Sequence, residues 1–126
     1  MQFATVVSAL MVLASPALVS GAQTDPDEAT KAQVREAIEQ YVEQDARVKE
    51  AFLILDPRNG EPLRLAFDYV HEGVEPHDQG YVACVDFKDR AGKVYDVDIV
   101  METGSDGLDV AKVFLHKAEG KEVAAK

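Results

Sequence analysis

The spacing of the apolar residues changes near Ala51, from about 3.6 residues before it to 2 residues after it. The first spacing is typical of one face of a helix, and the second is typical of a strand with one buried face. One helix followed by a run of short strands indicates an α+β domain, because parallel α/β folds alternate the two elements. The pattern therefore predicts a helix packed on an antiparallel sheet.

The predicted helix runs from about residue 26 to about residue 47. Its acidic start offers Asp25 as the cap, Pro26 at the first helical position and Glu28 for a capping box. The apolar stripe contains Val34, Ile38, Tyr41, Val42 and Val48, with Ala37 beside them. A stripe of this kind is usually part of a core, so we expect the helix to cover one face of the sheet.

Five strands are predicted to follow the helix as a curved antiparallel meander. On the second strand, alternation points Leu63, Leu65, Phe67 and Tyr69 toward the core. One sheet face is then apolar and covered, and the other is polar and open. The segments are an apolar run at 52–55, a turn at 56–60, strands at 63–70, 81–88 and 94–101, a last strand at about 108–116, and a short polar C-terminal tail at about 117–126.

In outline this order of elements resembles the cystatin-like architecture, in which a curved sheet cradles one helix. The resemblance is one of architecture alone. The chain has no Gln-x-Val-x-Gly hairpin, the segment that inhibitory cystatins carry, so protease inhibition is not implied.

The segment 89–93 reads as a three-residue hairpin loop with Gly92 in the left-handed conformation. This loop sets a register that pairs apolar residues with one another: Phe87 with Tyr95, Val85 with Val97, Ala83 with Ile99, and Tyr81 with Met101. On the other face the same register places Asp86 opposite Asp96 and Cys84 opposite Asp98. If the preceding hairpin places His71 opposite Tyr81, Asp68 also lies beside Cys84.

The open face is therefore expected to gather carboxylates around Cys84, namely Asp68, Asp86, Asp96 and Asp98. Like charges directly across a sheet are unfavourable, by up to about 1 kcal/mol. A bound cation would offset them, and carboxylates without a fixed geometry suit a hard ion such as calcium. The alternative is neutralisation by water and by basic side chains, which are Arg64, Lys88 and Lys112.

Two histidines, His71 and His77, fall in a predicted loop at 71–78 that also contains carboxylates. Imidazoles beside carboxylates can bind zinc, copper or nickel. The alternative is a solvated hairpin loop without a ligand. His116 lies on the last predicted strand and is expected at an edge rather than as a third ligand.

Cys84 is expected in mid-strand among carboxylates, which raise a thiol pKa, so a catalytic role is not predicted.

The first 22 residues carry no charged side chain, whereas the rest of the chain carries 13 basic and 23 acidic ones. Small residues, Ser20-Gly21-Ala22, end the uncharged segment and an acidic run comes directly after it. This pattern predicts a signal peptide at 1–22, one domain at 23–126, and a periplasmic or extracellular location. The segment lacks Lys and Arg, so an uncleaved anchor helix is the alternative, although spanning a bilayer takes about 20 apolar residues.

The net charge of −10 makes nucleic acid and anionic lipid unfavourable partners. One cysteine excludes an internal disulfide, and no cofactor motif is recognised. The run at 52–55 is apolar on both sides, so a homodimer contact is one way to cover it.

The leading hypothesis is a small non-enzymatic binding or interaction domain for an unknown protein or small-molecule ligand. A metal-binding protein that uses the acidic face or the His71–His77 loop is the alternative, and an enzyme with an unrecognised site is a third hypothesis.

Overall fold

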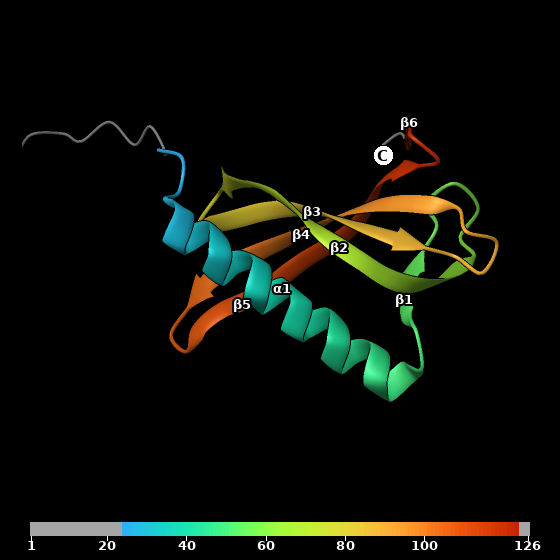
Figure 1. The fold of residues 1–126 in the computed structure, drawn as a ribbon, viewed down its shortest axis with the longest axis horizontal. Helices are drawn as coiled ribbons and strands as arrows, with labels where there is room; N and C mark the ends of the chain where they lie inside the picture. The colour runs from blue at the N-terminus through green and yellow to red at the C-terminus, as the bar shows by residue number, and fades with distance from the viewer. Residues whose placement is uncertain (1–23, 124–126) are drawn as a thin grey trace, which may run out of the picture.

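The computed structural model describes residues 24–123, which form one helix on a six-stranded antiparallel sheet (Figure 1). The strands lie in chain order, each antiparallel to the next. The α+β class is confirmed, with one strand more than predicted. The elements are α1 Glu28–Lys49, β1 Phe52–Leu55, β2 Pro62–His77, β3 Gly80–Lys88, β4 Val94–Gly104, β5 Gly107–Ala118 and β6 Lys121–Glu122.

The predicted signal peptide at 1–22 and the last three residues of the chain lie outside the described residues. Within residues 24–123, no helix combines the length and the apolar character needed to cross a membrane.

Helix α1 begins two residues later than predicted, because Asp27 caps it instead of Asp25. The carboxylate of Asp27 accepts a hydrogen bond from the backbone N–H of Thr30 at 2.7 Å, which satisfies one of the free amides of the first turn. Pro26 therefore precedes the helix. At the other end the helix continues to Lys49, and Glu50 ends it in the left-handed conformation, with φ of 65°.

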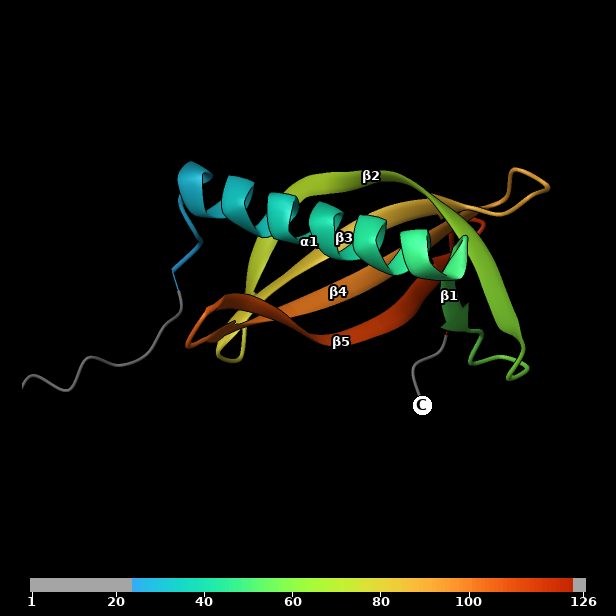
Figure 2. The same cartoon turned by 90° about the horizontal axis from the view of Figure 1, so that it is seen from below.

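The core lies between α1 and one face of the sheet, and Figure 2 shows the helix lying across that face. Val34, Ile38 and Val42, spaced by four residues, are fully buried there. Val48, expected in the same stripe, is instead 83% exposed in the last turn of the helix.

The register of the β3–β4 hairpin is confirmed at every predicted pair. The loop closes on Asp89, whose carboxylate accepts the backbone N–H groups of Ala91 and Lys93 at 2.9 and 3.0 Å. Gly92 has φ of 80°, the left-handed conformation that glycine adopts without strain. Asp86 therefore lies opposite Asp96, and Cys84 opposite Asp98.

The predicted loop at 71–78 is wrong, since β2 continues through it to His77. The strand contains two irregularities, and in the first Asp68 is an extra residue between the pairs Phe67↔Phe87 and Tyr69↔Asp86. An extra residue of this kind reverses the faces of the residues that come after it in the strand. Tyr69 accordingly turns to the open face, while Val70 and Val74 turn into the core.

Two predictions for β2 therefore fail. Tyr69, predicted in the core, is 49% exposed on the open face, whereas Phe67 keeps its predicted face opposite Phe87 but is 40% exposed. The residue opposite Tyr81 is Pro76, not His71. Proline is tolerated there because β1 pairs with β2 only as far as Leu65, so the outer edge of β2 beyond that point has no strand partner among the described residues.

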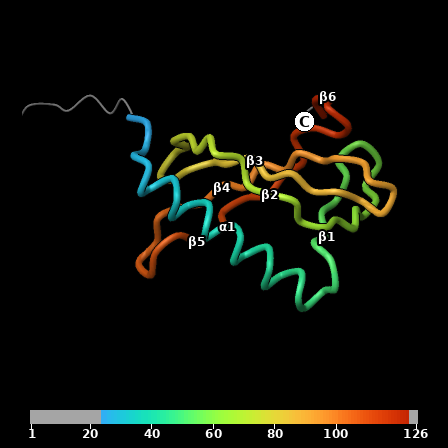
Figure 3. The backbone as a smooth tube through the Cα atoms, in the orientation of Figure 1, coloured from blue at the N-terminus to red at the C-terminus, as the bar shows by residue number. Residues whose placement is uncertain are grey.

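The C-terminal end of the sheet extends further than the prediction of a polar tail from about residue 117. β5 runs to Ala118, which is buried, and the short β6 pairs back on it (Figure 3). One irregularity in the β4–β5 pairing makes His116 an extra residue between the pairs Val97↔Leu115 and Asp96↔Lys117.

Candidate metal centre on the open sheet face

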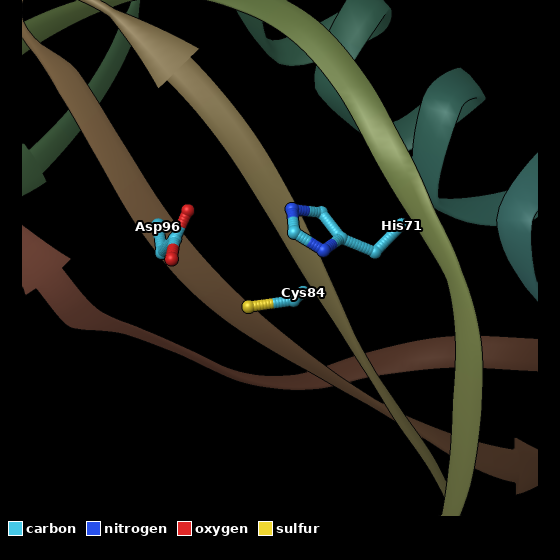
Figure 4. Close-up of side chains that lie close together, drawn as sticks. All are labelled: His71, Cys84 and Asp96. Carbon is cyan, nitrogen blue, oxygen red and sulfur yellow. The ribbon is translucent and has the colours of Figure 1, made fainter. Parts of the chain in front are cut away.

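Four neighbouring strands bring metal-binding side chains together on the open face of the sheet. We call this group the Cys84 cluster; it consists of His71 from β2, Cys84 and Asp86 from β3, Asp96 and Asp98 from β4, and His116 from β5. Figure 4 shows three of its side chains beside one another, each from a different strand. All six residues are partly shielded from solvent.

The ligand atoms of the Cys84 cluster form two triads that share the cysteine sulfur. One triad is His71, Cys84 and Asp96, and the other is Cys84, Asp98 and His116. Within each triad the ligand atoms all lie within 4.8 Å of one another. A tetrahedral zinc ion holds its ligand atoms about 3.3–3.8 Å apart, given bond lengths of about 2.0–2.3 Å. Small side-chain rotations would therefore bring either triad to coordination distance.

The members of the Cys84 cluster contact one another. Nε2 of His71 lies 2.7 Å from Oδ1 of Asp86, and the Cys84 thiol donates to Oδ1 of Asp98 at 3.0 Å. Nδ1 of His116 lies 3.4 Å from Oδ2 of Asp98 but has no hydrogen-bond partner among residues 24–123. One buried imidazole nitrogen beside the thiol thus remains unsatisfied.

Asp86 and Asp96 face each other across the β3–β4 ladder, and each changes the pKa of the other. The pKa of Asp96 is raised to about 6, first by burial and then by the hydrogen bond and the negative charge of Asp86. Burial also raises the pKa of Asp86, but hydrogen bonds with Asp96 and His71 outweigh it, so its net pKa is lowered. Asp96 is therefore the carboxyl group that holds the proton as the pH falls toward 6.

The pKa of the Cys84 thiol is raised to about 12, first by burial and then by the hydrogen bond to Asp98. The negative charges of the neighbouring carboxylates, including Asp96 and Asp86, contribute in the same direction. Near neutral pH the sulfur is a protonated thiol, which is a weak nucleophile. A bound cation would reverse this electrostatic setting, because metal coordination deprotonates a thiol.

The two imidazoles reach the open face at irregular points in the sheet. The extra residue Asp68 reverses the alternation of β2 and so directs His71 to this face, where its ring stacks on Tyr69 with centroids 5.1 Å apart. His116 is itself the extra residue of the β4–β5 irregularity. β-bulges that re-aim side chains are common next to functional sites.

The structure separates the predicted site residues into two sets. It brings Asp86, Asp96 and Asp98 to Cys84 as the register predicts, and it adds His71. It leaves Asp68 outside both triads, with Oδ2 at 3.4 Å from Nζ of Lys88.

His77 lies at the far end of β2 beside Asp78, with Nδ1 and Oδ2 3.6 Å apart. It is six residues from His71 along an extended strand, a span of roughly 15–20 Å. The structure therefore does not bring His71 and His77 together around one ion.

Sequence reasoning places His116 at an edge and does not join it to the Cys84 cluster. The signal that could have found it is the hairpin after β4. Gly104 pairs with Gly107, so counting back along both strands places Val113 opposite Asp98 and Leu115 opposite Asp96, close to His116. Two irregularities, at Ala111 and at His116, shift the observed partners of Asp98 and Asp96 to Phe114 and Lys117.

Comparisons with protein-family models, with curated proteins and with solved structures found no match to this chain.

Proposed function

We propose that this protein is a small non-enzymatic binding domain of the periplasm or the extracellular space whose ligand is a divalent transition-metal cation, with zinc as the best fit. The domain has a cystatin-like arrangement of a helix on a curved sheet and binds the ion on the face away from the helix. The observation that carries the proposal is the pair of His-Cys-Asp triads that share Cys84.

The chemistry of the donors selects the ion. The Cys84 cluster offers a thiolate sulfur, imidazole nitrogens and carboxylate oxygens, a mixture that suits zinc and related transition metals. Calcium and magnesium prefer ligand sets made entirely of oxygen. The acidic face alone would favour a hard ion, but the sulfur and the two imidazoles shift the preference toward a softer one.

The electrostatics of the face support a cation as well. Asp86 and Asp96 lie directly opposite each other, which costs stability when both are ionised. A cation would displace the protons of Asp96 and of the thiol, so binding should release protons and tighten as the pH rises through about 6. The raised pKa of Cys84 weighs against nucleophilic catalysis at neutral pH, because the thiolate is the nucleophile.

Isothermal titration of the purified protein with zinc tests the proposal. We expect micromolar or tighter binding, a gain in thermal stability with zinc, and at least a tenfold loss of affinity in Cys84→Ser and in His71→Ala. His77→Ala is the matched control, because this histidine lies outside both triads. Zinc binding weaker than about 100 µM, or an equal loss in His77→Ala, would overturn the assignment.

A further inference from the structure

A second concave site lies away from the Cys84 cluster, where β1 and β5 approach each other beside the C-terminal half of α1. This groove has a volume of about 590 Å³, within the range of small-molecule sites. Its walls are mainly apolar, and they include Phe52, Ile54, Leu55, Val113 and Leu115.

The groove occupies the gap where the sheet does not close on itself. β1 pairs with β2 alone, and the stretch of β5 from Lys112 to Leu115 pairs with β4 alone among the described strands, since β6 reaches only Lys117 and Ala118. Leu55 at the end of β1 is 69% exposed, although it follows three better-covered apolar residues. The apolar surface predicted to need cover on β1 is therefore still open here.

The charges at the groove differ in sign from the chain as a whole, which carries a net charge of −10. Nζ of Lys112 lies 5.1 Å from the centroid of the Phe114 ring, and no ion pair within residues 24–123 involves this ammonium group. The other lysine at the rim, Lys49, is neutralised by Asp45 at 2.7 Å. Lys112, which has no ion-pair partner in the described part of the chain, thus lies at the rim of the apolar groove.

We propose that this groove binds a single-chain amphiphile with an anionic head group, of the class of medium-chain fatty acids. The carboxylate would pair with Lys112, and the alkyl chain would lie against Phe52, Ile54 and Leu115. Burying apolar chain provides most of the affinity in such a site, while one placed charge orients the ligand. Each further methylene that enters the groove should tighten binding by up to about fourfold.

Two other occupants fit the groove less well. An extended peptide could add to the edge of β1, but this strand has only four residues and offers few backbone hydrogen bonds. A second copy of the chain would bring its own net charge of −10 against this one. A fatty acid instead matches both the apolar lining and the lysine at the rim.

Titration calorimetry with octanoate, decanoate and dodecanoate, each below its micelle concentration, tests the proposal. We expect affinity to rise along the series and to fall at least tenfold in Lys112→Met and further in Lys112→Glu. Lys121→Glu on β6 is the matched charge control and should bind like the parent. Zinc titration of the same variants should be unchanged, which separates this site from the Cys84 cluster.

Three results would overturn the proposal. The first is equal binding of dodecyltrimethylammonium, which has the same chain with a cationic head. The second is an equal loss of affinity in Lys121→Glu, which would reveal only a general charge effect. The third is sedimentation that shows a dimer which dodecanoate does not dissociate, because the groove would then be an interface between copies of the chain. A melting curve for each variant verifies that the protein is folded.

Discussion

The two faces of the β3–β4 hairpin are built from alternating residues of the same strands, yet they have opposite energetics. On the face toward α1, Val85, Phe87, Val97 and Ile99 are fully buried and pair with apolar residues. The alternate residues of the same strands lie on the open face, where the carboxylates of Asp86 and Asp96 face each other beside the half-buried thiol of Cys84. The first face stabilises the fold through burial, whereas the second reduces its stability in the absence of a ligand. Stability therefore does not explain the residues of the open face, and we propose ligand binding as the reason for them.

The largest expected difference between the faces is in stability. Phe87→Ala should lower the free energy of unfolding by about 3–5 kcal/mol, because the ring is fully buried and stacks on Phe52 at 4.8 Å between centroids. The open-face variant Asp86→Ala should cost far less. Urea melts of the metal-free protein measure both. A cost for Asp86→Ala equal to that for Phe87→Ala would show that the open face also holds the fold together.

An intermediate loss of stability is expected for Phe67, which lies directly before the irregularity at Asp68 in β2. Phe67→Ala should cost about 1–2 kcal/mol, because the ring is 40% exposed and meets Phe87 only edge-on at 6.1 Å. The same urea melts rank it against Phe87→Ala. A cost of about 3 kcal/mol or more would mean that Phe67 is buried in solution, as strict alternation predicts.

The smallest effect on stability is expected from the protonation of Asp96, and it depends on pH. The raised pKa of Asp96 means that its protonated form stabilises the fold; this contribution is full below pH 3.8 and is lost as the pH rises through about 6. Asp96→Asn keeps a hydrogen-bond donor without the charge, so the variant should gain about 1 kcal/mol on the parent between about pH 4 and 7, after allowance for solvent screening.

Chemical denaturation of the metal-free protein at about pH 4, 5, 6 and 7 tests this expectation. Asp109→Asn, on the exposed end of β5, is a matched control because it lies outside the Cys84 cluster. Parallel pH profiles of the unfolding free energy for the parent and Asp96→Asn would contradict the raised pKa of Asp96.

The fold was largely predictable where local patterns alone decide it. The helix, the strands and the β3–β4 register are determined by spacing and by one loop whose geometry Gly92 permits. The helix start was ambiguous because Asp25 and Asp27 can both cap, and only the reach of the side chain to Thr30 distinguishes them. Short-range hydrogen bonds of this kind are not determined by residue type.

The faces of β2 could not be predicted, because Tyr69 and Val70 are adjacent and both apolar. Either residue could occupy the core, and the choice depends on whether Asp68 is paired or extra, which packing against β3 decides. The same ambiguity affects Phe114 and Leu115 just before His116. The carboxylates and the thiol of the candidate site were therefore predictable, whereas the faces of both imidazoles depend on irregularities that alternation alone does not reveal.

The meander topology has a consequence for the order in which the domain folds. Each strand pairs with its neighbour in sequence, so every hairpin closes only a short loop and loses little chain entropy on closure. α1 is the exception, since it contacts β5 as well as the nearby β1 and β2. Docking of the helix against the complete sheet must therefore wait for the last long strand. We expect the transition state for folding to contain the central hairpins, with the contacts between helix and β5 formed late.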